Sequence, residues 1–296
     1  MKIKGWLMVI RAPFLPLSVV LAFLGACIAW YDGAFHLGHA LLAGAGILLA
    51  HISVDVLNEY FDHKSGVDLK TQRTPFSGGS GALPQGLVTP KQALWLGIGS
   101  LLATIPIGIY FTIVSGWQLL PLLLVAAALI VIYTPLILKM GWPEWAPGIG
   151  MGALPVLGAY FVQTGDYTVP AIVASVPSGI LVHNLLLLNE FPDVEADATA
   201  NRRTLPILIG KAKASIVYSV LTGMVYLWII GGVVTGQMPA FSLIALLTLP
   251  FAVKAIQGAV NYQNPGKLVP GMANNVLVVL ITQLLLGIGY ILAGIF

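Results

Sequence analysis

Long apolar stretches alternate with short polar connections along the whole chain. A helix needs about 20 apolar residues to cross a bilayer, and nine stretches reach that length: 12–31, 38–61, 92–114, 117–138, 145–164, 168–190, 213–235, 239–257 and 272–295. No connection is long enough to separate two domains. The pattern therefore predicts an all-α integral membrane protein with nine transmembrane helices in a single domain, residues 1–296.

Composition supports a membrane protein and excludes a soluble globule. Hydrophobic residues make up 58% of the chain and charged residues 8%, whereas soluble domains carry about 25% charged residues. The single cysteine, Cys27, excludes an internal disulfide. The start resembles a lipoprotein signal, but Arg11-Ala12-Pro13 interrupts its apolar run and eight further spans follow, so we expect an uncleaved first helix.

The basic residues predict the orientation. With nine spans, all fourteen Lys and Arg fall on the side of the N-terminus, at Lys2, Lys4, Arg11, Lys64, Lys70, Arg73, Lys91, Lys139, Arg202, Arg203, Lys211, Lys213, Lys254 and Lys267. The opposite connections hold Asp32, His36, His39 and Asp166 instead. The positive-inside rule then places the N-terminus in the cytoplasm and the C-terminus outside. The absence of a targeting segment favours a prokaryotic inner membrane.

An acidic motif occurs twice in this charge-poor chain. The first copy runs Asn58-Glu59-Tyr60-Phe61-Asp62, then Asp68 and Arg73-Thr74-Pro75; the second runs Asn189-Glu190-Phe191-Pro192-Asp193, then Asp197 and Arg203-Thr204-Leu205-Pro206. Seven of the eleven carboxylates lie in these copies: Glu59, Asp62, Asp68, Glu190, Asp193, Glu195 and Asp197. The copies end spans 2 and 6, a spacing typical of a parallel internal repeat. We expect them to meet at the cytoplasmic face.

The spacing of the motif residues indicates a functional polar surface. On a helix His51, Asp55, Asn58 and Asp62 form one stripe, and Asn189, Asp193 and Asp197 form another. Polar stripes within membrane helices usually face a cavity and serve function. Clustered carboxylates repel one another unless a cation lies between them, and carboxylate and amide oxygens with substrate phosphates are ligands of Mg²⁺. Basic side chains nearby would neutralise a diphosphate: Lys64, Lys70, Lys139, Arg73, Arg202 and Arg203.

Other polar residues admit simpler interpretations. Each motif alone could be a salt-bridged, solvated helix end, although two matched copies argue against it. Glu59 and Glu195 are expected to be bystanders, and His51 and His183 are expected to be hydrogen-bonded core residues. The glycine-rich segment 75–81 either supplies backbone N–H groups, caps the site, or is a flexible connector. The role of Glu144 stays open.

These residues resemble the UbiA-type superfamily of intramembrane aromatic prenyltransferases. The resemblance spans most of the chain and rests on both motifs, on Arg11-Ala12-Pro13, and on Tyr133-Thr134-Pro135 with Lys139 and Glu144. It implies a nine-helix bundle around a central cavity, capped by the loops between spans 2–3 and 6–7. It also implies Mg²⁺ bridging a prenyl diphosphate to Asn58, Asp62 and Asp68 on one side and to Asp193 and Asp197 on the other.

The same resemblance suggests roles for further residues. Tyr133, Arg73, Lys139 and Arg203 would contact the diphosphate during catalysis, with Asp62 and Asp193. Substrate binding would also involve Arg11, Asn58, Lys64, Lys70, Asn189 and Arg202. Asp62 and Asp68 are six residues apart, a longer spacing than the commonly quoted motif has, which resembles the menaquinone-pathway members that prenylate 1,4-dihydroxy-2-naphthoate.

The sequence therefore predicts Mg²⁺-dependent transfer of a prenyl group from a polyprenyl diphosphate to an aromatic acceptor, with 1,4-dihydroxy-2-naphthoate as the first candidate. Hydroxybenzoate, homogentisate, haem, a phenazine or a glycerol phosphate lipid would use the same metal site. A cation-coupled transporter is the alternative from another class, but the acids lie near the cytoplasmic helix ends and not at the midplane. The lipid bilayer is an expected partner and nucleic acid is not; oligomeric state and prenyl length stay open.

Overall fold

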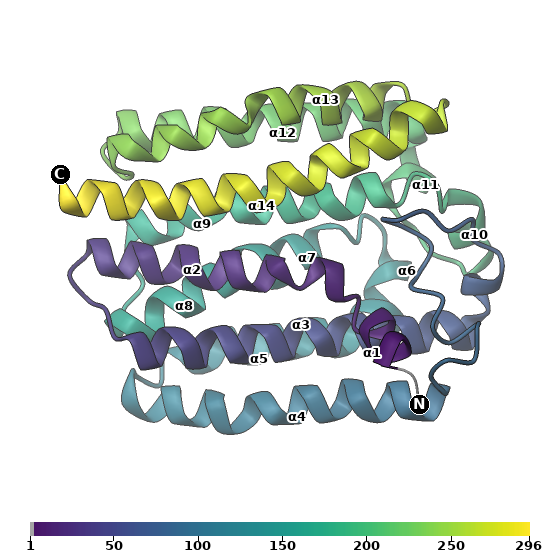
Figure 1. Ribbon diagram of the computed structural model, residues 1–296, viewed down its shortest axis with the longest axis horizontal. Coiled ribbons are helices and arrows are strands. Elements are labelled where there is room, and N and C mark those ends of the chain that lie inside the picture. Colours follow the sequence, from purple (N-terminus) through teal and green to yellow (C-terminus); the bar gives the residue numbers. More distant parts are fainter. Residues whose placement is uncertain (1–2) are drawn as a thin grey trace.

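The computed structural model describes residues 3–296 as helices joined by loops (Figure 1). Segments labelled η are 3₁₀ or π turns. In chain order the elements are α1 (Ile3–Val9), η1 (Ala12–Phe14), α2 (Pro16–Tyr31), α3 (Leu37–Ser65), η2 (Val67–Leu69), α4 (Pro90–Val114), α5 (Leu119–Ile132), η3 (Tyr133–Ile137), α6 (Leu138–Met140), α7 (Trp145–Gly148), η4 (Ile149–Ala153), α8 (Leu154–Thr164), α9 (Val169–Asn189), α10 (Val194–Thr199), α11 (Leu205–Ile209), α12 (Lys211–Val234), η5 (Ala240–Thr248), α13 (Leu249–Val260) and α14 (Pro265–Ile295).

The prediction of nine spans is confirmed for the part of the chain that the structure describes. Nine helices there are long and apolar enough to cross a membrane: Ala12–Tyr31, Leu37–Ser65, Pro90–Val114, Leu119–Met140, Trp145–Thr164, Val169–Asn189, Lys211–Val234, Ala240–Val260 and Pro265–Ile295. They run side by side as one bundle, with the first and last described residues at opposite ends (Figure 1). The last span starts at Pro265 and not at residue 272, because its first turn is capped by the Asn264 side chain.

The largest buried cluster lies among α2, α8, α9, α12 and α14, whereas α4 packs mainly on α3 at the edge of the bundle. Small residues permit the closest contacts. A methyl group built on Gly152 would come within 2.6 Å of the Ser178 carbonyl oxygen on α9. Gly152 therefore permits close packing of span 5 against α9.

Four of the described spans are not continuous α-helices, and the first of them is span 1, which begins with the 3₁₀ turn Ala12–Phe14. Span 4 ends in the π turn Tyr133–Ile137, span 5 contains the π turn Ile149–Ala153, and span 8 begins with the 3₁₀ segment Ala240–Thr248. Pro135 lies inside the first π turn and has no N–H to donate to the helical ladder. Single π turns often occur at functional sites, and both of these lie along the cavity described below.

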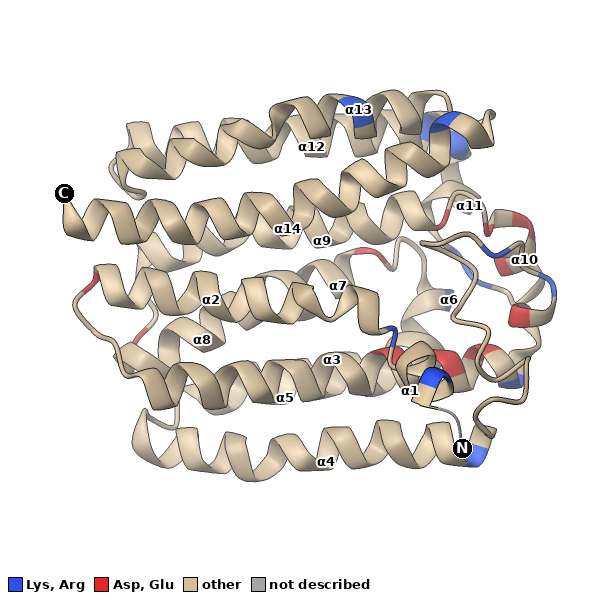
Figure 2. Ribbon diagram, in the orientation of Figure 1, with Lys and Arg blue, Asp and Glu red and all other residues tan. Residues whose placement is uncertain are grey.

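Charges gather at one end of the bundle (Figure 2). The acidic motifs and the Lys and Arg residues share that end, and Asp32 and Asp166 lie in the connections at the other end. Lys2, one of the residues used to predict orientation, lies outside the described residues. Residues 66–89, between α3 and α4, fold over the charged end together with α10 and α11, as expected for the two cap loops (Figure 1).

Candidate active site

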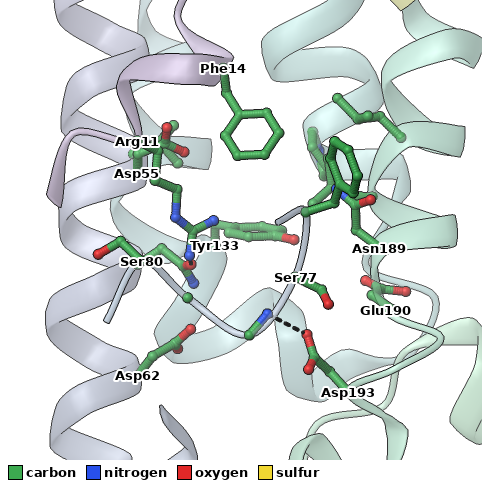
Figure 3. Close-up of a pocket in the computed structure, with 18 of the residues that line it drawn as sticks. Arg11, Phe14, Asp55, Asp62, Ser77, Ser80, Tyr133, Asn189, Glu190 and Asp193 are labelled. Carbon is green, nitrogen blue, oxygen red and sulfur yellow. Dashed lines mark hydrogen bonds between the residues drawn. The ribbon is translucent and has the colours of Figure 1, made fainter. Parts of the chain in front are cut away.

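A cavity of about 450 Å³ opens between the two acidic motifs (Figure 3). Its charged end is lined by side chains of α3, the 66–89 loop and the segment after α9: Asn58, Asp62, Asp68, Thr71, Ser77, Asn189, Glu190, Asp193, Asp197 and Arg202. Its other walls are mostly apolar or aromatic, with the polar side chains of Arg11, His51 and Asp55 among Phe14, Leu17, Leu129, Ile130, Tyr133, Met151, Val182, Leu185 and Leu186. The cavity thus joins an end dominated by carboxylates to a pocket whose walls are mostly apolar or aromatic.

The 66–89 loop holds Asp193 from across the cavity. The backbone N–H of Gly78 donates to Asp193 Oδ2 at 2.9 Å (Figure 3, dashed line), and the Thr71 hydroxyl donates to Oδ1. Gly78 has a φ of +81°, and a methyl group there would lie 2.9 Å from the Arg73 Cα atom. The glycine-rich segment therefore supplies a backbone N–H in a conformation that other residues rarely adopt.

Arg202 joins the two acidic motifs. Its Nη1 atom donates to Asp197 Oδ1 at 2.8 Å, and Nη2 contacts Asp62 Oδ1. The Arg202 side chain is 13% exposed, and both carboxylates are buried further. A guanidinium thus occupies the position between the motifs where sequence reasoning expected a metal to bridge them.

Glu59 and Arg11 organise the first motif. Arg11 Nε donates to Glu59 Oε1 at 2.9 Å and Nη2 donates to Asn58 Oδ1 at 3.2 Å; Glu59 also accepts from the backbone N–H and the hydroxyl of Ser80, each at 2.7 Å. Glu59 is fully buried and does not line the cavity, so it holds Arg11 and Ser80 in place, and the expectation that it takes no direct part in the chemistry stays a prediction. Its structural role could not be predicted because its partner Arg11 lies next to a distant break in the first span. Glu195, by contrast, has an 82% exposed side chain.

The sequence left the role of Glu144 open, and the structure gives it a structural one. It is fully buried and accepts from the Leu205 N–H at 2.6 Å, which fastens the segment after the second motif to the α6–α7 connection. It lies against Glu190, and one oxygen of each carboxyl has no hydrogen-bond partner. Burial, with Glu144 beside it, raises the pKa of Glu190 well above its ordinary value.

Two buried motif acids that lie outside the membrane spans, Asp68 and Asp197, also hold their protons more tightly than free carboxyl groups do. Burial, together with the neighbouring Asp62, raises the pKa of Asp68 to about 7. Burial raises the pKa of Asp197 to about 7 as well, although the Arg202 guanidinium opposes that shift. These two groups are therefore ready to exchange a proton for a cation near neutral pH.

The two histidines behave as expected. His51 is hydrogen-bonded to Ser18, and His183 accepts from the Trp142 indole N–H at 2.9 Å and contacts the side chain of Asn184. His183 does not line the cavity, whereas His51 does.

Comparison with known proteins decides the family. The model of the UbiA prenyltransferase family matches residues 18–290. The chain belongs to the UbiA prenyltransferase family. It is therefore a prenyltransferase, and family membership disfavours the cation-coupled transporter.

Relatives in sequence support the family of this chain, and solved structures match its fold. It is 31% identical to 1,4-dihydroxy-2-naphthoate octaprenyltransferase of Bacillus subtilis (strain 168), over 83% of this chain and 79% of the relative. It is 25% identical to the protein of that name from Haemophilus influenzae, over 98% and 97% of the two chains. The fold matches a UbiA homologue from Aeropyrum pernix K1 with a TM-score of 0.69 at 17% identity, covering 94% of this chain and 97% of that one. It also matches a homologue from Archaeoglobus fulgidus bound to GPP and Mg²⁺, with a TM-score of 0.64 at 12% identity over 95% and 99% of the chains.

The donor atoms of this UbiA-family site suit a hard cation. Asn58, Asp62, Asp68, Asp193 and Asp197 present oxygen ligands of the kind that Mg²⁺ takes. The buried Oδ2 atom of Asp68 has no hydrogen-bond partner and is therefore available to bind a cation. Among residues 3–296, however, no three His, Cys, Asp or Glu side chains are already grouped as a metal site. The reason is local, because Arg202 separates Asp62 from Asp197 and the 66–89 loop holds Asp193.

The structure brings only some of the predicted basic residues to the cavity. Arg11 and Arg202 line it, and so does Tyr133. Five others have exposed side chains and do not line it: Lys64, Lys70, Arg73, Lys139 and Arg203. Their diphosphate roles stay predictions that would require a movement of the cap. Arg203 instead fixes the loop through its backbone, which bonds to Leu138 and Trp142.

Proposed function

We propose that this UbiA-family enzyme transfers a polyprenyl group from its diphosphate to 1,4-dihydroxy-2-naphthoate in an Mg²⁺-dependent reaction of menaquinone biosynthesis. The observation that carries the proposal is the two-ended cavity, which places the paired acidic motifs against a hydrocarbon pocket. We propose this acceptor because two proteins that are similar to most of this chain are 1,4-dihydroxy-2-naphthoate octaprenyltransferases.

The residues divide the work by position. Mg²⁺ held by Asn58, Asp62, Asp68, Asp193 and Asp197 would neutralise charge on the leaving diphosphate. Arg202 and Arg11 line the same end and offer guanidinium groups to the remaining phosphate oxygens. The charge that develops as the C–O bond breaks is thus met by groups already in place, which is electrostatic catalysis.

The apolar end protects the allylic cation. Phe14, Tyr133, Leu185 and Leu186 line this part of the cavity, and they exclude the water that would otherwise capture the cation. The Tyr133 ring lies between the two motifs (Figure 3), where its π face can stabilise positive charge. The aromatic acceptor then attacks the cation and, if it carries a carboxylate on the attacked carbon, loses CO₂.

A product assay tests the proposal. Purified protein in detergent is given Mg²⁺, geranylgeranyl diphosphate and 1,4-dihydroxy-2-naphthoate, and Asp62→Asn and Asp193→Asn are assayed beside the wild type. We expect prenylated product that requires the metal and both carboxylates. Turnover of another acceptor but not of the naphthoate would discard the pathway. No diphosphate release with any acceptor or chain length, from folded protein, would discard the reaction.

We further propose that the acidic end faces the cytoplasm of a prokaryotic cell. The support is the segregation of Lys and Arg to that end of the bundle (Figure 2).

A further inference from the structure

Three polar residues contact one another within the bundle, outside the two acidic motifs: Ser18, His51 and Asp55. Ser18 Oγ lies 2.8 Å from His51 Nδ1, and His51 Nε2 lies 3.5 Å from Asp55 Oδ2. His51 and Asp55 line the cavity. The Oδ2 atom of Asp55 is buried and makes no hydrogen bond.

Their depth separates them from the acidic motifs. Asp55 and His51 precede Asn58 on α3 by three and seven residues, which at 1.5 Å per residue is about 4.5 Å and about 10.5 Å further into the bundle. Figure 3 shows Asp55 in the part of the cavity where Phe14 lies, away from Asp62 and Asp193.

An ionisable group at this position is costly unless it is used. Carboxylates within transmembrane helices are rare, and those that line a cavity usually act on a substrate. A carboxylate that served only packing would have both oxygens satisfied, as Glu59 has for its two oxygens. The Oδ2 atom of Asp55 meets only His51 Nε2, at a long 3.5 Å, so this carboxylate, which lines the cavity, keeps the capacity to accept a hydrogen bond from a ligand there.

The surroundings specify the rest of that ligand. Phe14 and Tyr133 line the same cavity, with the aliphatic side chains of Leu17 and Met151. Aromatic and aliphatic walls around one acceptor oxygen suit a flat aromatic ring that carries a hydroxyl group.

We propose that Asp55 is the acceptor-binding catalytic base of this enzyme, and that Ser18 and His51 position it; this inference rests on the proposed function. The phenolic O–H bond breaks and its proton passes to the Asp55 carboxylate. The electron pair released on oxygen drives the ring carbon to form a C–C bond to C1 of the prenyl group, whose C–O bond breaks with its electrons leaving on diphosphate.

The proton is returned when the acceptor carries a carboxylate on the attacked carbon. Loss of CO₂ from the resulting β-keto acid sends an electron pair back to the ring oxygen, which recovers its proton from Asp55. The base thus ends each turnover in the state in which it began, with no proton exchanged with water through the apolar walls.

Asp55→Asn tests the assignment, because it keeps the size of the side chain and removes the base. We expect kcat to fall at least about a hundredfold, while the KM for geranylgeranyl diphosphate changes less than about threefold. His51→Gln should raise the KM for the acceptor and lower kcat by about tenfold, again without changing the KM for the diphosphate. Unchanged kcat and acceptor KM in Asp55→Asn would overturn the proposal, and so would a matched loss of diphosphate binding.

Direct binding keeps the proposal testable if no turnover is found. Anaerobic titration of 1,4-dihydroxy-2-naphthoate, followed by quenching of protein fluorescence, should show at least about tenfold weaker binding to Asp55→Asn than to the wild type. Equal binding would overturn the subsite, whereas failure of turnover alone would overturn only the proposed function. Ser18→Ala should weaken binding, and its matched control is Ser178→Ala, because Ser178 is equally buried, has no hydrogen-bond partner and lies outside the cavity.

Discussion

Arg202 holds the two acidic motifs together, and its replacement should expose a cation site. Arg202→Gln removes one guanidinium from two carboxylates, Asp62 and Asp197, whose side chains are only 8% and 6% exposed. Breaking a buried ion pair by removing one partner costs about 3–5 kcal/mol, and we take about 3 kcal/mol because Arg202 retains some contact with water. The unfolding midpoint should fall by on the order of 5 °C.

Mg²⁺ should restore much of that loss in the variant. With Arg202 removed, the two carboxylates repel and are free to bind the cation, and Mg²⁺ at ten times its dissociation constant would return about 1.4 kcal/mol. In the wild type the cation must first displace the guanidinium, so the same Mg²⁺ concentration should raise the midpoint by less. The single cysteine suits the assay, because Cys27 is buried and a thiol-reactive dye would report unfolding.

The comparison with a surface pair completes the test. Lys211→Gln removes a 3.4 Å ion pair to the exposed Glu195, and such pairs contribute about 0–1 kcal/mol. Its midpoint and its response to Mg²⁺ should match the wild type. If Mg²⁺ raised the midpoints of Arg202→Gln and of the wild type equally, Arg202 would be a structural ion pair only, and the reasoning that it occupies the cation position would fail.

Three further outcomes follow from the cap and the charged end. The Mg²⁺ concentration for half-maximal rate should rise below pH 7 by roughly tenfold per pH unit for each proton that the metal displaces, and so by up to about a hundredfold if it displaces both. The reason is that burial raises the pKa of Asp68 and of Asp197 to about 7; titrations at pH 6 and pH 8 that agree would contradict this. Gly79→Ala should lower product formation by at least about tenfold, since its φ is +71° and the added methyl would lie 2.8 Å from Asp68 Oδ1, whereas Gly86→Ala, with a φ of +66° and open space around it, should stay near wild type. Asp166→Cys should react with an impermeant maleimide added to intact cells, because Asp166 is exposed at the end opposite the motifs and the native cysteine is buried; labelling only after lysis would reverse the orientation.

Much of the fold could be predicted because apolar length alone identifies a membrane span. The breaks within spans could not, since they depend on tertiary contacts. Pro135 signals a local disturbance, but nothing in the sequence says that the chain widens into a π turn there, or that another follows in the next span. Helix ends also differ from the predicted ones where a capping residue outside the apolar run, such as Asn264, extends the helix.

The sequence could predict which acidic residues line the candidate site, but not which Lys and Arg residues do. Asp62 and Asp193 stand out because carboxylates are rare in this chain, and both line the cavity. Arg202 and Arg203 are adjacent in sequence, yet only Arg202 enters the cavity; the left-handed turn at Asn201, with a φ of +56°, precedes them. Hydropathy carries no information on such a turn, so the sequence could not separate the two arginines.

The contacts across the cavity are reciprocal, and this arrangement couples the two cap loops. Asp62 of the first motif is held by Arg202, which follows the second motif, and Asp193 of the second motif is held by Thr71 and Gly78, which follow the first. Under the proposed function, an incoming diphosphate would attract the guanidinium, and a cation bound with it would attract both carboxylates. Neither ligand alone would replace all of these partners, since an anion would leave the carboxylates unpaired and a cation would leave the guanidinium unpaired. We therefore expect the prenyl diphosphate and its metal to bind together, with both loops rearranging in the same step.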